Sequence, residues 1–444
     1  MQKITGYDVV VIGSGGAGLR AGISSAERGE KTLILSKGKI NRSGATLLAG
    51  ANISADIACD GGSLFELGIT DLNKEDTKEK WYEDLLHEGF YLNNGDLLKI
   101  FVETAKDRIK ELMDWGMKVR GIEGERGITV FGSDILDTLY KRAKEVGAEF
   151  LPDVMFVDLI IAKGKVQGTI CLDIYSGELF VIPAKVVILA TGGAHNLFAN
   201  NSGSTDLCGE GQAAALRAGA ELIDMEMISF CPTVTRFPTM YRGNILPYIF
   251  ISTGYGRLVN KFGQTFTHRY LSPKVEQLAL DSEWNKMLLS YAIQSEINAG
   301  GATKNGGVYF TLDLQPVNII EELYQDLPSL RTGIYADIMK IFESGKAFHV
   351  QPAAHYFEGG IRIDTKMETK VPGLYAAGEC TGGMFGANRV SAATTEMLVE
   401  GAIAGVSAAE YASKETESEI DETWLKNLEV DLNLPFRRRR GYYK

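Results

Sequence analysis

The sequence predicts an α/β protein organised around a strand–helix–strand unit at its N-terminus. Two apolar runs of strand length, Val9–Ile12 and Thr32–Leu35, flank a stretch with helical spacing. Between the first run and the helix lies a G-x-G-x-x-G pattern that contains Gly13, Gly15, Gly16 and Gly18. A glycine pattern after a strand and before a helix is typical of a Rossmann-like dinucleotide-binding domain.

Each glycine of the pattern has a physical role in such a domain. Gly13 permits the tight turn out of the strand, Gly15 lets a pyrophosphate approach the backbone, and Gly18 lets the helix pack close to the strand. The helix N-terminus then offers free N–H groups and a positive dipole end to the phosphates. The alternative interpretation is a glycine-rich turn that binds no ligand.

The end of the second strand leaves the identity of the dinucleotide open. A unit that binds NAD or FAD usually places Asp or Glu there, on a ribose hydroxyl. This chain has Ser36, followed by Lys37. A serine can still bind a ribose, but it does not repel a phosphate as a carboxylate does.

Length and charge limit the class of protein. The chain has 444 residues, of which 45% are apolar, and this length predicts two or three domains. The net charge of −11 argues against nucleic acid or an anionic membrane as the main partner. No apolar run reaches the roughly 18 residues of a membrane span. The polar segment before Val9 is too short for a signal peptide.

The five cysteines predict a reducing compartment, and we expect the protein to be cytoplasmic. None lies in a C-x-x-C pair, and no Cys/His group has metal spacing. We therefore expect no disulfide framework and no iron–sulfur or zinc site in this chain. A basic run at residues 437–440 has two interpretations: a solvated tail, or a segment that docks onto an acidic partner subunit.

The rest of the chain alternates between helical and strand patterns. Helices are expected within residues 74–116 and 134–146, and strands within residues 149–189. The last of these strands ends in Ala190-Thr191-Gly192-Gly193, and a short helix follows at residues 207–219. Residues 228–348 are richer in aromatics and prolines, which indicates a separate substrate-facing domain. Rossmann-like motifs return from residue 359 onward.

Four motifs together carry a resemblance to a known family. They are the N-terminal glycine loop, the strand end at residues 190–193, the His355-Tyr-Phe-Glu-Gly-Gly-Ile stretch, and the Pro-Gly-Leu-Tyr-Ala-Ala-Gly-Glu379 stretch followed by Gly-Ala-Asn-Arg389. As a set they resemble the flavoprotein subunit of succinate dehydrogenase and fumarate reductase, and the related L-aspartate oxidase. The resemblance runs from residue 5 to about residue 412.

This resemblance implies FAD and a domain plan. Residues 1–227 and 349–412 would form the FAD-binding domain, residues 228–348 an inserted α+β capping domain, and residues 413–444 a C-terminal tail. The family generally continues with a C-terminal helical domain, whereas this chain ends about thirty residues after the last flavin helix. The residues implied to bind FAD are Gly13, Gly15, Gly16, Gly18, Ser36, Lys37, Ser43, Gly44, Ala45, Thr191, Gly192, Glu210, Glu379 and Thr394. For Glu210 alone, the alternative is a carboxylate that only favours a helix dipole.

The departures from the family pattern concern the flavin link and the substrate. Covalent members carry a His where this chain has Gly44, so FAD is expected to be held non-covalently. The family's Phe-His-Pro-Thr motif, whose His grips a substrate carboxylate, reads Phe-Cys231-Pro-Thr here. An ungapped count places Lys286 where the family has its proton-donating Arg, and Arg257 is the substitute if that count slips. Lys is a competent acid, but its point charge does not reproduce the planar guanidinium.

Two substrate positions match the family. His355 matches the substrate-binding His, and Arg389 matches the Arg that clamps a carboxylate against the flavin. A buried Arg is costly unless an anion pairs with it, which favours Arg389 as a substrate contact. The alternative for His355 is a satisfied core histidine.

Two functions remain open at this point. The first is an FAD-dependent oxidoreductase that moves a hydride between flavin N5 and a small carboxylate-bearing substrate through Arg389, His355 and Lys286, without efficient turnover of succinate or fumarate. The second is an electron-transfer flavin subunit of a larger redox complex with an iron–sulfur partner.

Overall fold

The computed structural model describes most of the chain, including the predicted strands Val9–Ile12 and Thr32–Leu35 and most of the predicted inserted region. The described residues are 1–49, 55–70, 72–123, 125–246, 256–281, 286–312, 333–389, 393–416, 420, 425–426 and 428–430. The basic run at 437–440 lies outside these residues. No helix among the described residues is long and apolar enough to cross a membrane.

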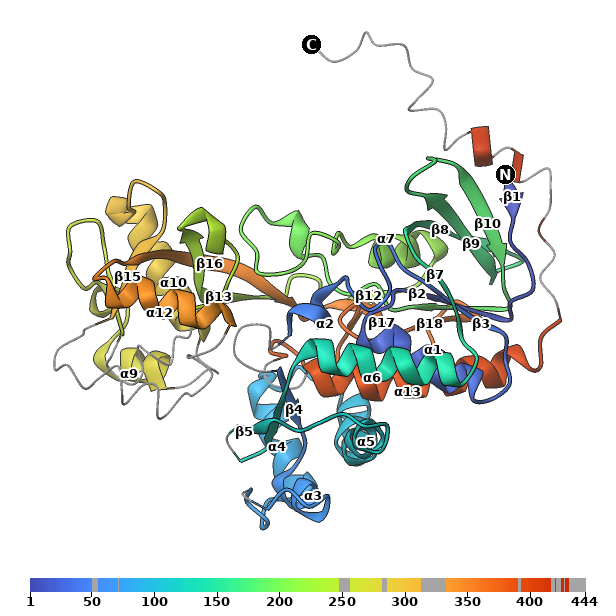
Figure 1. Ribbon diagram of the computed structural model, residues 1–444, viewed down its shortest axis with the longest axis horizontal. Helices are drawn as coiled ribbons and strands as arrows, with labels where there is room; N and C mark the ends of the chain where they lie inside the picture. The colour runs from blue at the N-terminus through green and yellow to red at the C-terminus, as the bar shows by residue number, and fades with distance from the viewer. Residues whose placement is uncertain are drawn as a thin grey trace, which may run out of the picture.

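A five-stranded parallel sheet forms the centre of the larger part of the molecule (Figure 1). Its order is β18-β11-β2-β3-β7. The bounds of these strands, in that order, are Leu374–Ala376, Val186–Leu189, Val9–Ile12, Thr32–Leu35 and Glu149–Leu151. All four residues of β2 are buried, as expected for a strand covered on both faces. Residues distant in the sequence therefore meet at the carboxyl ends of neighbouring strands.

Helices cover this sheet and connect it to a smaller lobe. Helix α1 (Gly16–Ala26) packs along α13 (Ala393–Ala412), and Gly401 and Gly405 of α13 allow the two backbones to approach. Helix α6 (Gly132–Glu145) also packs on α1. The lobe below them in Figure 1 contains α3, α4 and α5 and the strands β4, β6 and β5. The bounds of these elements, in that order, are Gly61–Glu66, Lys78–Glu88, Gly95–Asp114, Ala55–Ala58, Gly127–Val130 and Gly121–Glu123.

Two further small sheets complete this part of the molecule. One has the order β1-β10-β9-β8, and the other has the order β12-β17-β19. The bounds of these strands, in that order, are Gln2–Lys3, Leu179–Pro183, Lys165–Asp173, Val154–Ala162, Leu222–Ile223, Gly360–Arg362 and Thr381–Gly382. The short helices α2 and α7 span Ala45–Leu48 and Glu210–Ala218.

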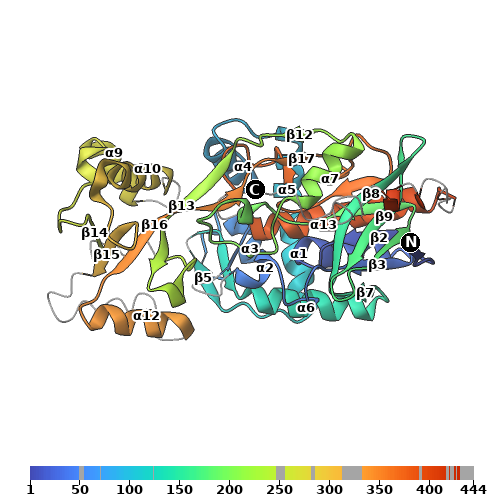
Figure 2. The same ribbon diagram turned by 90° about the horizontal axis from the view of Figure 1, so that it is seen from above.

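The inserted region forms a sheet of its own, to the left in Figures 1 and 2. The order of this antiparallel sheet is β13-β16-β15-β14, and helices α9, α10 and α12 lie beside it. The bounds of these elements, in that order, are Ile228–Phe237, Phe348–Phe357, Val308–Leu312, Gly256–Val259, Pro273–Asp281, Lys286–Glu296 and Gly333–Glu343. The two long strands β13 and β16 run side by side and connect this sheet with the rest of the molecule (Figure 2).

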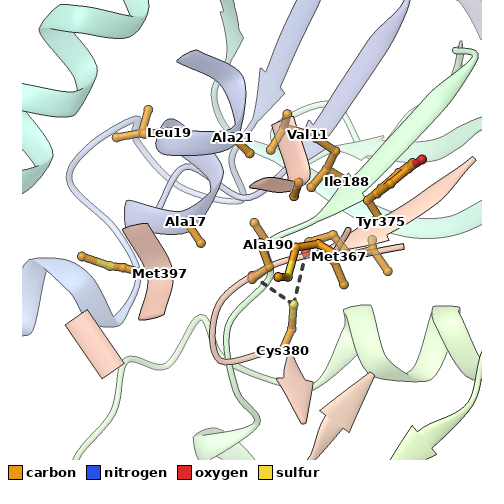
Figure 3. Close-up of a cluster of buried hydrophobic side chains, with 14 of the residues drawn as sticks. Val11, Ala17, Leu19, Ala21, Ile188, Ala190, Met367, Tyr375, Cys380 and Met397 are labelled. Carbon is orange, nitrogen blue, oxygen red and sulfur yellow. Dashed lines mark hydrogen bonds between the residues drawn. The ribbon is translucent and has the colours of Figure 1, made fainter. Parts of the chain in front are cut away.

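Two separate apolar cores correspond to these two parts. The larger core takes residues from both ends of the chain, including Val11, Ala17, Ile188, Tyr375 and Met397 (Figure 3). The second core lies wholly within residues 241–350.

Some element bounds differ from those expected. The helix expected from residue 207 begins at Glu210, because Gly209 adopts a left-handed conformation with φ +76°. The helices expected within residues 74–116 are confirmed as α4 and α5, and Phe90 and Tyr91, which have positive φ angles, lie between them.

Candidate active site

The glycine loop leaves strand β2 through two close backbone contacts. Gly13 has φ +115°, and a Cβ atom there would lie 2.2 Å from the Ala190 carbonyl oxygen. A Cβ atom on Gly18 would lie 1.9 Å from the Gly13 carbonyl oxygen. Only glycine fits either position, so that α1 starts directly against the sheet.

Gly15 differs from its neighbours because the space beside it is open. A Cβ atom on Gly15 would approach only Thr46 Oγ1, at 3.5 Å. Helix α1 then begins at Gly16 with no acidic side chain in its first turn. The Gly16 N–H donates to Thr46 Oγ1 at 3.1 Å. An anion could therefore lie against this helix N-terminus without like-charge repulsion from the first turn.

A cavity with a volume of about 320 Å³ opens beside this loop. Its volume is at the lower end of the range for small-molecule sites. It is lined by the glycine loop, by the loop after β3, by residues 190–192, 202–203 and 206–207, and by His355, Tyr356, Glu379 and Thr394. Residues 243–245 of the inserted region contribute to the same lining. The cavity therefore lies where the two parts of the molecule meet.

Hydroxyl and charged groups follow the second strand along the cavity. Ser14 and Ser36 share a hydrogen bond of 2.9 Å between their hydroxyl oxygens. Lys37 forms an ion pair with Glu210 and donates to the Asp206 carbonyl oxygen at 2.7 Å. These contacts join the end of β3 to the start of α7.

Gly44 has a backbone conformation that only glycine adopts readily. Its φ is +80° and its ψ is −179°. Its N–H donates to Asp206 Oδ2 at 3.3 Å. The space beside Gly44 is open, so a histidine here would be disfavoured by backbone strain and not by its size.

We define the histidine wall as the part of the cavity lined by His195, Ser202, His355, Tyr356 and Glu379. His195 Nε2 lies 2.5 Å from the His355 carbonyl oxygen and 3.2 Å from Glu379 Oε1. The Glu379 carboxylate also accepts hydrogen bonds from the N–H groups of Gly193 and Phe357, each at 3.2 Å. Burial favours a raised pKa for Glu379, but the His195 charge outweighs it and the pKa is lowered.

The two histidines of this wall have opposite pKa shifts. Burial opposes the charged form of His195, yet the Glu379 carboxylate raises its pKa overall. Burial and the nearby Lys286 charge hold the pKa of His355 well below its usual value. The Nδ1 atom of His355 lies 2.7 Å from the Ser202 hydroxyl oxygen. His355 is therefore neutral near pH 7, whereas His195 carries charge to a higher pH than an ordinary histidine.

Arg389 lies behind the cavity, fully buried, among four carboxylates. Its Nη2 is 3.3 Å from Glu396 Oε1 and donates to the carbonyl oxygens of Thr381, at 2.9 Å, and Glu358, at 3.3 Å. Burial opposes the charge of Arg389, but Glu396, Glu358, Glu379 and Glu400 outweigh that effect and raise its pKa. One guanidinium thus offsets several buried acids.

The pKa values of these acids are raised chiefly because the carboxyl groups are buried, and the charge of Arg389 offsets this effect only in part. Burial raises the pKa of Glu396 well above its usual range, and it raises the pKa of Glu400 to about 7. Glu400 accepts from the Gly378 N–H at 2.6 Å and from the Thr381 hydroxyl at 3.0 Å. Glu358 is buried, and burial raises its pKa although Arg389 and Lys286 oppose the shift.

Comparisons with known proteins identify the family. Residues 8–395 match the family model described as an FAD binding domain. The chain is 32% identical to a fumarate reductase (CoM/CoB) subunit of Methanothermobacter marburgensis, over 91% of this chain and 73% of that protein. It is 31% identical to the 8-methylmenaquinol:fumarate reductase flavoprotein subunit of Wolinella succinogenes, over 92% of this chain and 66% of that protein.

The chain belongs to the fumarate reductase/succinate dehydrogenase flavoprotein family. A solved structure of the Sdh1 complex of Mycobacterium smegmatis has the same fold, with a TM-score of 0.81 and 28% identity over 99% of this chain and 74% of that chain. The protein is an FAD-dependent oxidoreductase, and the α/β fold, the FAD cofactor and the family expected from the sequence are confirmed.

The residues of this flavoprotein fit FAD at the glycine loop. The open space at Gly15, the position of the loop at the N-terminus of α1, and the absence of an acidic side chain in the first turn of this helix suit a pyrophosphate. The structure brings nearly all the residues expected to bind FAD to one cavity. They are Gly13, Gly15, Gly16, Ser36, Lys37, Ser43, Gly44, Ala45, Thr191, Gly192, Glu210, Glu379 and Thr394.

The remaining expected residues lie outside the cavity lining. Gly18 packs α1 against the sheet, and Arg389 contacts groups of its own chain. Lys286 is buried at the start of α10, with its Nζ 5.3 Å from the centroid of the Tyr356 ring. Arg257 is exposed on β14, the edge strand of the inserted sheet. Cys231 packs in a small apolar cluster with Val234 and Ala353.

The sequence interpretation missed three residues of this region. His195 and Glu396 line the cavity, and Glu358 lies beside Arg389. A signal existed for two of these acids: Glu396 and Glu400 are four residues apart within a helix that is otherwise rich in alanine, glycine and apolar residues. Such spacing puts both carboxylates on one helix face.

Proposed function

We propose that the protein transfers a hydride between bound FAD and a carbon atom of a small carboxylate-bearing substrate other than succinate or fumarate. The observation that carries this proposal is the shared cavity: the glycine loop and His355 line the same space. FAD supplies the two-electron chemistry when it is bound. The glycine loop would hold its pyrophosphate, and Ser36, Lys37 and Glu210 its adenosine side.

The substrate would lie along the histidine wall. A neutral His355, fixed by Ser202, would orient the substrate through a hydrogen bond. Lys286 would be the proton donor or acceptor, since it lies against Tyr356, which lines the cavity. Oxidation would remove a hydride from one carbon and a proton from its neighbour, and reduction would return both. Arg389 would bind the substrate carboxylate by exchanging part of its contact with Glu396.

Two positions at which this chain differs from the family pattern support a substrate other than succinate. Cys231 is buried in an apolar cluster and offers no cation to a second carboxylate. Lys286 presents a point charge in place of a planar guanidinium. We also propose that FAD is bound non-covalently, because the backbone at Gly44 takes a glycine-only conformation.

The domain plan is part of this proposal. The FAD-binding domain would comprise residues 1–227 and 349–412, and residues 228–348 would form the cap. The two separate cores support this division. Strands β13 and β16 would be the two connections about which the cap moves, and closure would exclude water from the cavity.

Anaerobic mixing tests the proposal. Oxidised protein is mixed with saturated carboxylates and amino acids, and dithionite-reduced protein with enoates, while flavin absorbance is followed. At least one compound should reduce or reoxidise the flavin, and Lys286→Gln should slow this step at least about tenfold. The matched control is Lys346→Gln, an exposed residue of the same region. A panel that leaves the flavin unchanged would overturn the proposal.

A second function is supported by the names of the relatives, of which two are subunits. In this alternative the protein is an electron-transfer flavin subunit that passes electrons to an iron–sulfur partner. Purification from the source organism at native expression level distinguishes the two. Co-purification with a cysteine-rich protein supports the alternative, whereas turnover by a 48.5 kDa chain or its homo-oligomer counts against it.

A further inference from the structure

His195 is held in the cavity wall by a close fit. It lies in the short turn His195–Leu197 that follows β11, and only 2% of the residue is exposed. A Cβ atom on Gly203 would lie 2.5 Å from the imidazole ring, so that only glycine fits against it. The ring of Phe357 meets it edge-on, with the ring centroids 5.5 Å apart. The imidazole therefore has little freedom to turn away.

The two ring nitrogens of His195 have different surroundings. Nε2 is directed at the His355 carbonyl oxygen and the Glu379 carboxylate. Nδ1 is buried and has no hydrogen-bond partner among the described residues. A buried polar atom normally has a partner. Because His195 belongs to the cavity lining, a ligand bound in the cavity could supply the partner that Nδ1 lacks.

Three charged or titratable groups face this imidazole. Glu379 favours its protonated form, while Arg389 and the neighbouring His355 oppose it. The net direction is a raised pKa for His195. A protonated imidazole has an N–H on both nitrogens, so the Nδ1 atom becomes a donor with a positive charge.

We propose that His195 is an anion-binding residue of the cavity, which donates a hydrogen bond from Nδ1 to a negatively charged group of the bound ligand. Two sources provide such a group: a substrate carboxylate, or the negative charge that FAD carries once it is reduced. The first source rests on the proposed function, and the second requires only that FAD is bound. In both cases binding is strongest below the raised pKa of His195 and is lost as the pH rises through it.

Two variants separate the nitrogens. His195→Asn places an amide donor near the Nδ1 position without the charge, and His195→Gln places one near the Nε2 position. His268→Gln is the control, because His268 is exposed in the inserted region. For each protein the FAD midpoint potential is measured from pH 5.5 to 9 without carboxylate. The dissociation constants of carboxylates are then measured from the spectrum of oxidised FAD.

The two sources give different results. If a carboxylate is the anion, His195→Gln weakens carboxylate binding at least about tenfold at pH 6, His195→Asn less, and the midpoint potentials stay unchanged. If reduced FAD is the anion, a tenfold loss of preference for the reduced form lowers the potential by about 30 mV. In the first case the dissociation constant of the carboxylate depends less on pH in the variants than in the unmodified protein. In the second case the midpoint potential does.

The proposal is overturned if both variants retain FAD and match the control in potential and in carboxylate affinity. If no carboxylate perturbs the flavin of the unmodified protein, the proposed function fails, and the midpoint potentials alone decide the role of His195.

Discussion

The two sides of the cavity differ in how they are built. The glycine-loop side consists of Gly13, Gly15 and Gly16 with the hydroxyls of Ser36 and Thr46, and most of it comes from one continuous segment. The histidine wall and the buried acids behind it come from β16, α13 and the loops that follow β11, β16 and β18. The glycine-loop side is formed mainly by backbone, and we call it the backbone side. The histidine wall and the buried acids form the other side, which we call the charged side.

This difference separates cofactor binding from substrate choice. To bind a cofactor, the backbone side needs only glycines at fixed positions, because a glycine loop at a helix N-terminus binds any pyrophosphate of suitable shape. The charged side depends on which acids and bases meet, so a single replacement changes its chemistry. We propose that Cys231 and Lys286, which both lie in the inserted region, are such replacements.

The largest expected effect is on the backbone side. Gly18→Ala would put a Cβ atom 1.9 Å from a carbonyl oxygen that cannot move aside. The cost should be at least about 4 kcal/mol, with loss of soluble folded protein. A methyl group at position 15 has room, so Gly15→Ala should fold. The variant should bind FAD weakly, because the methyl group would lie where we propose that the pyrophosphate approaches the backbone. The melting temperature of the apoprotein and the flavin-to-protein ratio measure the two effects. Normal flavin content in Gly15→Ala would contradict the assignment.

The next effect is expected at Arg389 on the charged side. Arg389→Met leaves Glu396 and Glu358 without their cation and should cost about 3–5 kcal/mol at pH 7. The loss should shrink at pH 5, because both carboxyl groups have raised pKa values and become protonated. Denaturant unfolding at the two pH values measures this, with the exposed Arg28→Met as control. Unchanged stability at pH 7 would show that Arg389 does not compensate these acids.

Glu400 should make stability depend on pH. Its pKa is raised from 4.5 to about 7, so the native state binds more protons than the unfolded state between these values. Stability therefore falls as the pH rises through this window. Glu400→Gln should remove the fall and be more stable than the unmodified protein by up to about 3 kcal/mol at pH 8. Glu410→Gln, on the exposed face of the same helix, is the control. Parallel stability curves for the unmodified protein and Glu400→Gln would contradict the raised pKa.

The smallest effect is expected when the hydrogen bond that holds His355 in place is removed. Ser202→Ala removes a hydrogen bond of 2.7 Å to Nδ1, which is worth about 1 kcal/mol. The apparent KM for the carboxylate substrate should rise about fivefold with little change in kcat, because the group orients bound substrate. Ser413→Ala is an exposed control. A fall in kcat without a change in KM would instead assign Ser202 to the chemical step.

The sequence predicted the two sides unequally. Gly13 and Gly18 could be assigned their packing roles because the glycine pattern is local and its physical demands are known. The position of His195 against Glu379 could not be predicted, since 184 residues separate them and only the parallel pairing of β11 with β18 brings their loops together. Arg389 was expected to bind a substrate carboxylate, whereas the carboxylate it contacts is that of Glu396 in the same chain.

One measurement tests the contrast between the two sides most directly. Protein loaded with FAD is reduced anaerobically with dithionite and mixed in a stopped-flow instrument with fumarate, and then with the other enoates of the panel. We expect about one FAD per chain, released entirely by acid precipitation, reoxidation by another enoate, and little or no reoxidation by fumarate. Rapid reoxidation by fumarate would contradict the view that the charged side has been altered while the backbone side is retained.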